Sequence, residues 1–186
     1  MSIGECVQEA IVFEMKGAFE RAYFPTAMAI VQTVAKITNG DGRSELAIQR
    51  FIRENFTLIT FMGMQRALPL PLKVPFALKR LIPTFNSLHG VEEIVTLTIT
   101  ETLKYGRLPE VFAAGSTGTF EVHDGRLWMP SGLVRGLLGS VIFNQVNQGE
   151  IIAEDCWISI SDFRMFVSEL FGRQDLAERI MKFYSF

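Results

Sequence analysis

The spacing of the hydrophobic residues changes along the chain, and this change restricts the fold more than any other feature. Up to about residue 112 these residues recur at intervals of three and four, which predicts amphipathic helices. Beyond that point, two short runs at 119–122 and 127–129 flank Asp124 and Gly125, a strong signal for a hairpin turn. The sequence therefore predicts an α+β fold, in which an N-terminal helical half packs with a small antiparallel β-sheet.

Proline and glycine divide the helical half, residues 1–112. The first helix should break before Pro25, which would then open a second helix. Ser44 is expected to cap the most regular helix, and a short helix is expected at residues 76–82. Residues 87–105 fit either a strand or a helix, and we favour the helix because Ser87 can cap it and Gly106 can end it. The apolar stripe of the most regular helix comprises Ile48, Phe51, Ile52, Phe56, Ile59 and Met62.

The second half, residues 113–186, should consist of a hairpin, a helix, a strand and two terminal helices. In the hairpin, Val122 is expected to pair with Leu127 and Phe120 with Met129. Ser131 is expected to cap the next helix, in which Gly132, Gly136 and Ser140 form a ridge that permits close backbone approach. Cys156, Ile158 and Ile160 should lie on one face of a strand. A helix that starts at Ser161 should contain Phe163 and Phe166, and the last helix should contain Leu176, Ile180 and Phe183.

Composition and charge narrow the class of protein. A hydrophobic content of 48% with 16 Phe indicates one well-filled core, with apolar surface left for a pocket and for a homodimer through helical surfaces. The net charge of −2 gives no general attraction to nucleic acid. Cys6 and Cys156 alone form no disulfide framework, and no apolar run reaches the ~18 residues of a membrane span. We therefore expect one cytoplasmic domain over residues 1–186, without a signal peptide.

Short stretches of the chain resemble the heme nitric oxide/oxygen binding domains. They are Phe85-Asn86-Ser87-Leu88-His89, the hairpin at 119–129 and the glycine-containing segment at 132–138. With Asp155-Cys156 and Ser161-Asp162, they are also similar to the 4-vinyl-reductase-like small-molecule-binding domains and, more remotely, to the TRAPP vesicle-transport subunits. The resemblance implies a shared α+β fold with an internal apolar cavity. It also implies heme or another tetrapyrrole as the cofactor, with His89 as the ligand of the metal.

The resemblance also indicates which residues would surround such a cofactor. The heme family holds the propionates with Tyr-x-Ser-x-Arg, and the matching positions here are Met129, Ser131 and Leu133, so that Ser131 remains but the cationic anchor does not. Phe85 and Phe56 are candidates to line the cavity, and their alternative role is in the core. For His89 the alternative is a helix cap or a half-buried polar group.

No familiar catalytic motif accompanies these residues, and the phosphate-loop, dinucleotide, nucleophile-elbow and zinc-protease patterns do not occur. The expected function is a sensor or carrier that binds a hydrophobic small molecule or tetrapyrrole in an internal cavity. The alternative is an assembly or adaptor subunit of the TRAPP type, and an enzyme comes third because no residue explains a reaction. Cys156 is expected to be a small core residue, and His123 an exposed turn residue.

Overall fold

The computed structural model describes residues 1–64, 90–115, 119–160 and 163–184, and these residues form an α+β fold. The helices are α1 Ile3–Met15, α2 Phe19–Thr38, α3 Glu45–Glu54, α4 Phe56–Gly63, α6 Val91–Tyr105, α7 Leu133–Ile142 and α8 Gln174–Tyr184, with short 3-10 helices η1 Gln145–Asn147 and η2 Val167–Glu169. The strands are β1 Phe112–Ala114, β2 Glu121–His123, β3 Arg126–Met129, β4 Trp157–Ile160 and β5 Phe163–Phe166. The helix expected at 76–82 lies outside the described residues.

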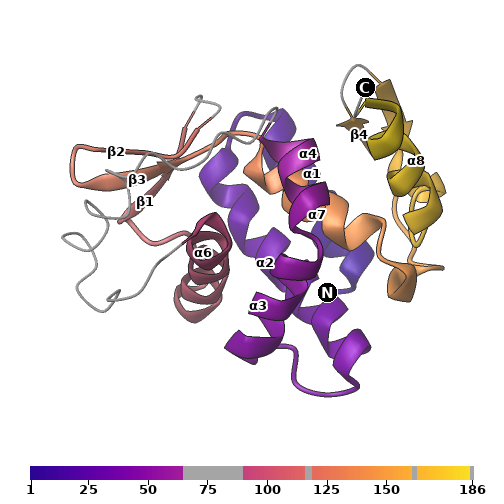
Figure 1. The fold of residues 1–186 in the computed structure, drawn as a ribbon, viewed down its shortest axis with the longest axis horizontal. Helices are drawn as coiled ribbons and strands as arrows, with labels where there is room; N and C mark the ends of the chain where they lie inside the picture. Colours follow the sequence, from indigo (N-terminus) through magenta and orange to yellow (C-terminus); the bar gives the residue numbers. More distant parts are fainter. Residues whose placement is uncertain (65–89, 116–118, 161–162, 185–186) are drawn as a thin grey trace.

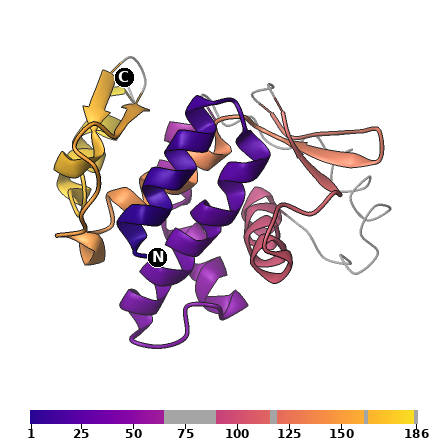
Figure 2. The ribbon, with the colours of Figure 1, turned by 180° about the vertical axis from the view of Figure 1, so that it is seen from behind.

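Helices form the centre of the molecule, and the two sheets lie at opposite ends of it (Figure 1). The sheet β1-β3-β2 and α6 lie at one end, and β4 with α8 lies at the other, as the reverse view also shows (Figure 2). The first sheet is mixed rather than purely antiparallel, because β1 runs parallel to β3 while β2 runs antiparallel to it. The second sheet is the antiparallel pair β4–β5.

The predicted helix break before Pro25 is wrong, because the chain turns at Gly17 instead. Gly17 has a φ of 69°, a conformation that glycine adopts without strain, and it lies between α1 and α2. Pro25 is buried inside α2, where its missing N–H removes one hydrogen bond from the helix. The burial of most of the α2 face from Ala22 to Val34 compensates for that loss.

The predicted stripe from Ile48 to Met62 belongs to two helices instead of one. Asn55 separates α3 from α4, and its side-chain amide donates a hydrogen bond to the carbonyl oxygen of Phe51 at 2.9 Å. Ser44 is the N-cap residue of α3 as expected, although its side chain makes no capping hydrogen bond.

The structure confirms the helical interpretation of the segment that also fitted a strand. Helix α6 follows Gly90, which is its N-cap residue, whereas Ser87 lies outside the described residues. Gly106 ends α6 in the left-handed conformation, with a φ of 68°.

The predicted β2–β3 hairpin is also confirmed. Val122 is opposite Leu127, and the turn residues Asp124 and Gly125 have φ values of 52° and 70°. The signal was reliable because few residue pairs accept positive φ at both central positions of a two-residue turn. Strand β1, which the sequence did not predict, adds a third strand beside β3.

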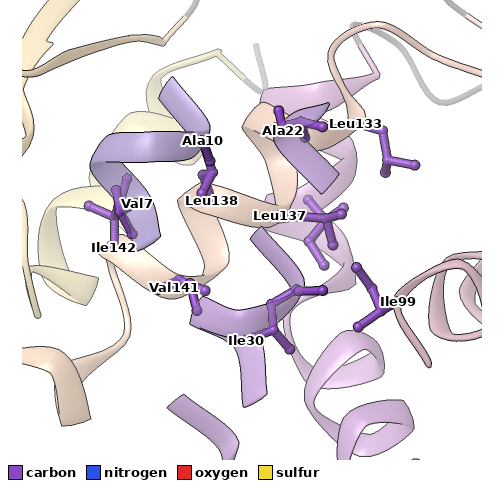
Figure 3. Packing of buried hydrophobic residues seen from close by; sticks show 14 of the residues in the cluster. Val7, Ala10, Ala22, Ile30, Ile99, Leu133, Leu137, Leu138, Val141 and Ile142 are labelled. Atoms are coloured by element: carbon purple, nitrogen blue, oxygen red, sulfur yellow. The ribbon is translucent and has the colours of Figure 1, made fainter. Parts of the chain in front are cut away.

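Helix α7 packs against α1, α2 and α4, and its apolar residues are all buried. Figure 3 shows Val7 and Ala10 of α1 beside Ile142 and Leu138 of α7. The helix starts after Gly132 and ends at Ile142, so Ser131 is not the N-cap residue that was predicted.

Small residues bring α4 and α7 into backbone contact. A side chain at Gly136 would collide with the carbonyl oxygen of Ile59, and one at Gly132 would collide with that of Gly63. A Cβ atom at Gly63 would lie 2.6 Å from the carbonyl oxygen of Gly132, closer than real Cβ atoms come. The close approach predicted from the glycine ridge is therefore confirmed, and α4 is the neighbour.

The buried polar side chains differ in their hydrogen bonding. The side-chain amide of Asn147 donates to the Thr33 hydroxyl at 2.9 Å and to the carbonyl oxygen of Val141 at 2.8 Å, and Asn147 and Thr33 are fully buried. The hydroxyl of Tyr23 is equally buried but has no hydrogen-bond partner among the described residues. Burial raises the pKa of that phenol above its usual range.

A helix was predicted where the structure has β5. Phe163 is opposite Ile160, and Phe166 is opposite Trp157, in an antiparallel ladder. Two phenylalanines three positions apart would share one face of a helix, but in a strand they lie on opposite faces. Both are exposed, at 58% for Phe163 and 48% for Phe166, so neither marks a core.

None of the described helices is both long enough and apolar enough to cross a lipid bilayer.

Candidate functional site

Two of the predicted cofactor residues, His89 and Phe85, lie outside the described residues. The positions that correspond to the tyrosine and arginine of the heme family, Met129 and Leu133, are fully buried in the core. A buried leucine offers no charge to a propionate. Heme binding through His89 stays a prediction.

The other two predicted cofactor residues, Phe56 and Ser131, are described, and the structure does not bring them together. Both are half-buried, Phe56 at the start of α4 and Ser131 just before α7. Gly63, at the far end of α4, lies against Gly132. Phe56 is seven residues from Gly63, and therefore about 10 Å away along the helix axis. The two residues thus belong to opposite ends of the α4–α7 contact.

An apolar pocket of about 430 Å³ lies between the β4–β5 hairpin and α8, and we call it the C-terminal pocket. Its volume falls in the range of about 300–1,000 Å³ that is typical of small-molecule sites. The hairpin contributes Ile160, Phe163, Arg164 and Met165, and α8 contributes Leu176, Arg179, Ile180, Phe183 and Tyr184. The sequence predicted an internal cavity, whereas this pocket opens at one end of the molecule.

The hairpin side of the C-terminal pocket follows from strand alternation. Ile160 is opposite Phe163 and Ile158 is opposite Met165, and in an antiparallel ladder such pairs lie on the same face. One face of the hairpin is therefore apolar. The alternation of Ile158, Ile160, Phe163 and Met165 is the signal that could have revealed this wall, had residues 163–166 not been interpreted as helical.

The helical side of the C-terminal pocket follows from the spacing that predicted α8. Leu176, Ile180 and Phe183 are separated by four and three residues, so they share one helix face. Leu176 and Ile180 are half-buried, and Phe183 is 75% exposed. The last predicted helix is confirmed, but its apolar face lines an open pocket instead of a closed core.

Aromatic rings meet at Tyr184, near the end of α8. Its ring centroid lies 5.3 Å from that of Phe183 and 6.4 Å from that of Phe163, both in edge-to-face arrangements. Phe61 of α4 contacts the same ring at 6.0 Å. Such separations are typical of attractive aromatic pairs. Tyr184 thus connects the wall of the pocket to the central helices.

Among the described residues that line the C-terminal pocket, two are charged, and both are arginines. The guanidinium of Arg164 lies 3.6 Å from the ring centroid of Trp157, a cation–π contact. Arg179 makes no hydrogen bond or ion pair with the residues that the structure describes. Asp175, one turn before Arg179, accepts hydrogen bonds from Arg173 at 2.9 and 3.0 Å. These bonds, chiefly, hold the pKa of the Asp175 carboxyl below its usual range.

Other hollows of the surface have a different character. A larger one, of about 720 Å³, lies between α2 and α3 and is lined by both polar and apolar side chains, with Arg50, Arg53 and Glu54 among the polar ones. A smaller one, of about 320 Å³, includes the charged residues Glu9, Glu20, Arg21 and Arg107. The C-terminal pocket is the most apolar of these three.

The two cysteines have the properties of core residues. Cys156 is 8% exposed and Cys6 is fully buried, and burial raises the pKa of each thiol to about 11. Both thiols are therefore protonated, and weakly nucleophilic, at neutral pH. His123 is exposed as predicted and stacks on Trp128 at 4.6 Å between ring centroids. Within the described ranges, no three His, Cys, Asp or Glu residues gather closely enough to hold a metal ion.

Comparison with known proteins gives one similarity. Residues 104–186 match the model of a protein family described as Rv1289. This segment contains a little under half of the chain, including the β2–β3 hairpin, α7 and every residue that lines the C-terminal pocket. No curated protein and no solved structure matches the chain.

Proposed function

We propose that the protein binds a hydrophobic small molecule in the C-terminal pocket and acts as a carrier or sensor of that molecule. The observation that supports this function is the lining of the pocket, in which seven of the nine side chains are aliphatic or aromatic. Small-molecule sites typically combine such a lining with a few polar groups that orient the ligand.

The exposure of the aromatic residues supports the same function. Phe163 and Phe183 both line the pocket, and they are 58% and 75% exposed. Leaving apolar surface in water costs about 25 cal/mol per Å², and a bound apolar molecule would remove that cost. We place this binding in the cytoplasm, the compartment that two unpaired thiols favour. The assembly or adaptor function is the second candidate, because exposed aromatic residues also serve protein contacts.

Titration with a neutral fluorophore, N-phenyl-1-naphthylamine, tests the proposal. Ile180→Glu places a carboxylate on the wall of the C-terminal pocket, and we expect the fluorophore to bind at least tenfold more weakly. The control is Leu46→Glu, because Leu46 is 77% exposed on α3 and lines the separate hollow between α2 and α3. This variant should bind like the unmodified protein, and circular dichroism should show that both variants are folded.

Two results would overturn the proposal. One is the absence of saturable fluorophore binding, which is what the assembly function predicts. The other is unchanged binding by a folded Ile180→Glu variant.

A further inference from the structure

We infer that the natural ligand of the C-terminal pocket is an anionic amphiphile, whose apolar chain lies in the pocket and whose acidic head group pairs with Arg179. This inference rests on the proposed function and adds the chemical class of the ligand.

The described lining of the C-terminal pocket is positively charged. The nine described residues that line it include Arg164 and Arg179 and no Asp or Glu. A cation at the edge of an apolar site favours ligands that carry a negative charge and disfavours cationic ones. The whole chain carries a net charge of −2, so this positive character belongs to the pocket and not to the protein as a whole.

Arg164 lines the pocket, but its guanidinium already has a partner on the other face of the hairpin. It is opposite Ser159 in the β4–β5 ladder, which places it on the face of the hairpin that also carries Trp157. Its guanidinium lies 3.6 Å from the Trp157 ring centroid on that face. The apolar face, with Ile160 and Phe163, is the one that lines the pocket.

Arg179 is the cation that remains for a ligand. It is adjacent to Ile180 on the wall of the pocket, and it makes no ion pair with any described residue. The acidic residues nearest to it in sequence are Asp175 and Glu178. Asp175 attracts Arg179, but both of its oxygens accept hydrogen bonds from Arg173, and Glu178 does not line the pocket. A guanidinium binds a carboxylate or phosphate through two parallel hydrogen bonds, so an acidic head group fits this position.

Three ligands with the same ten-carbon chain test the inference: decanoate, decanol and decyltrimethylammonium. Each is titrated against the fluorophore-loaded protein of residues 1–186. We expect decanoate to bind at least tenfold more tightly than decanol, and the cationic ligand to bind most weakly. Arg179→Gln should remove the preference for decanoate and leave decanol affinity within twofold. Lys182→Gln removes a positive charge from the same helix outside the pocket, and it should retain the preference.

The outcomes distinguish the two proposals. If decanoate and decanol displace the fluorophore equally well, or if Arg179→Gln keeps the preference for decanoate, the anionic head group is wrong while apolar binding stands. Equal losses in Arg179→Gln and Lys182→Gln would show a general charge effect and would also overturn the inference. If none of the three ligands displaces the fluorophore from the unmodified protein, the proposed function fails as well.

Discussion

Gly136 shows how strongly a single residue can be restricted. We expect Gly136→Ala to lower the free energy of unfolding by about 1–3 kcal/mol or more, because its Cβ atom would collide with the Ile59 carbonyl oxygen and push α4 from α7. The control is Gly149→Ala, where no atom lies within 4 Å of the new Cβ but φ is 87°, so about 1 kcal/mol of backbone strain is expected. Urea unfolding measures both values. A smaller loss at Gly136 than at Gly149 would contradict the tight contact.

Tyr23 and Thr33 provide a second pair of single-residue changes. Tyr23→Phe removes a buried hydroxyl without a described partner, so stability should be unchanged or rise by up to about 1 kcal/mol. Thr33→Val removes the oxygen that accepts from Asn147, and we expect a loss of about 1–3 kcal/mol. Thermal unfolding of the two variants tests whether their stabilities change in these opposite directions. A marked loss in Tyr23→Phe would mean that the hydroxyl is satisfied in solution.

At the scale of elements, an ion pair between Arg135 and Glu14 joins α7 to α1. Glu14 is only 9% exposed, so removing its partner leaves a carboxylate that is poorly solvated. We expect Arg135→Met to cost about 1–3 kcal/mol, and the double variant Glu14→Gln with Arg135→Met to regain at least half of that loss. Chemical unfolding of the single and double variants measures the coupling. Strictly additive losses would show that the pair contributes nothing.

The elements that the sequence predicted well are those whose signals are local. The Asp124-Gly125 turn specifies its own hairpin through positive φ, and the spacing of Gly132, Gly136 and Ser140 indicated the close backbone contact of α7. The predictions were wrong where contacts with other parts of the chain determine the local structure. Pro25 is a local helix breaker that the packing of α2 overrides, and Phe163 has no local sign of its pairing with Ile160.

The candidate site was predicted less well than the fold. Of the residues suggested by the family resemblance, His89 and Phe85 lie outside the described residues. Phe56 and Ser131 lie at opposite ends of the contact between α4 and α7. The C-terminal pocket depends on two walls that meet only after β5 pairs with β4, and α8 alone does not reveal the second wall. Homodimer formation stays a prediction.

At the scale of the whole molecule, the segment that matches the Rv1289 family lacks the helices against which α7 packs. Residues 104–186 begin inside α6, and α7 packs its buried faces against α1, α2 and α4, all of which precede the segment. We expect a fragment of residues 104–186 to be unfolded, because α7 would expose its apolar side chains to water. Dispersed amide resonances in its NMR spectrum would contradict this expectation, and the full-length chain serves as the folded control.

The isolated pair of strands β4–β5 has a consequence for local opening of the native protein. A hairpin of two strands is marginal without a third layer, and here α8 covers it while the pocket between them stays open. We therefore expect the amide hydrogens of β4 and β5 to exchange with deuterium faster than those of α7. A ligand that binds only when the hairpin is folded against α8 should slow exchange in β4 and β5 by a factor of about the ratio of its concentration to its Kd. Exchange in α7 should be unaffected. Equal protection of both regions with and without decanoate would show that the ligand does not complete this end of the molecule.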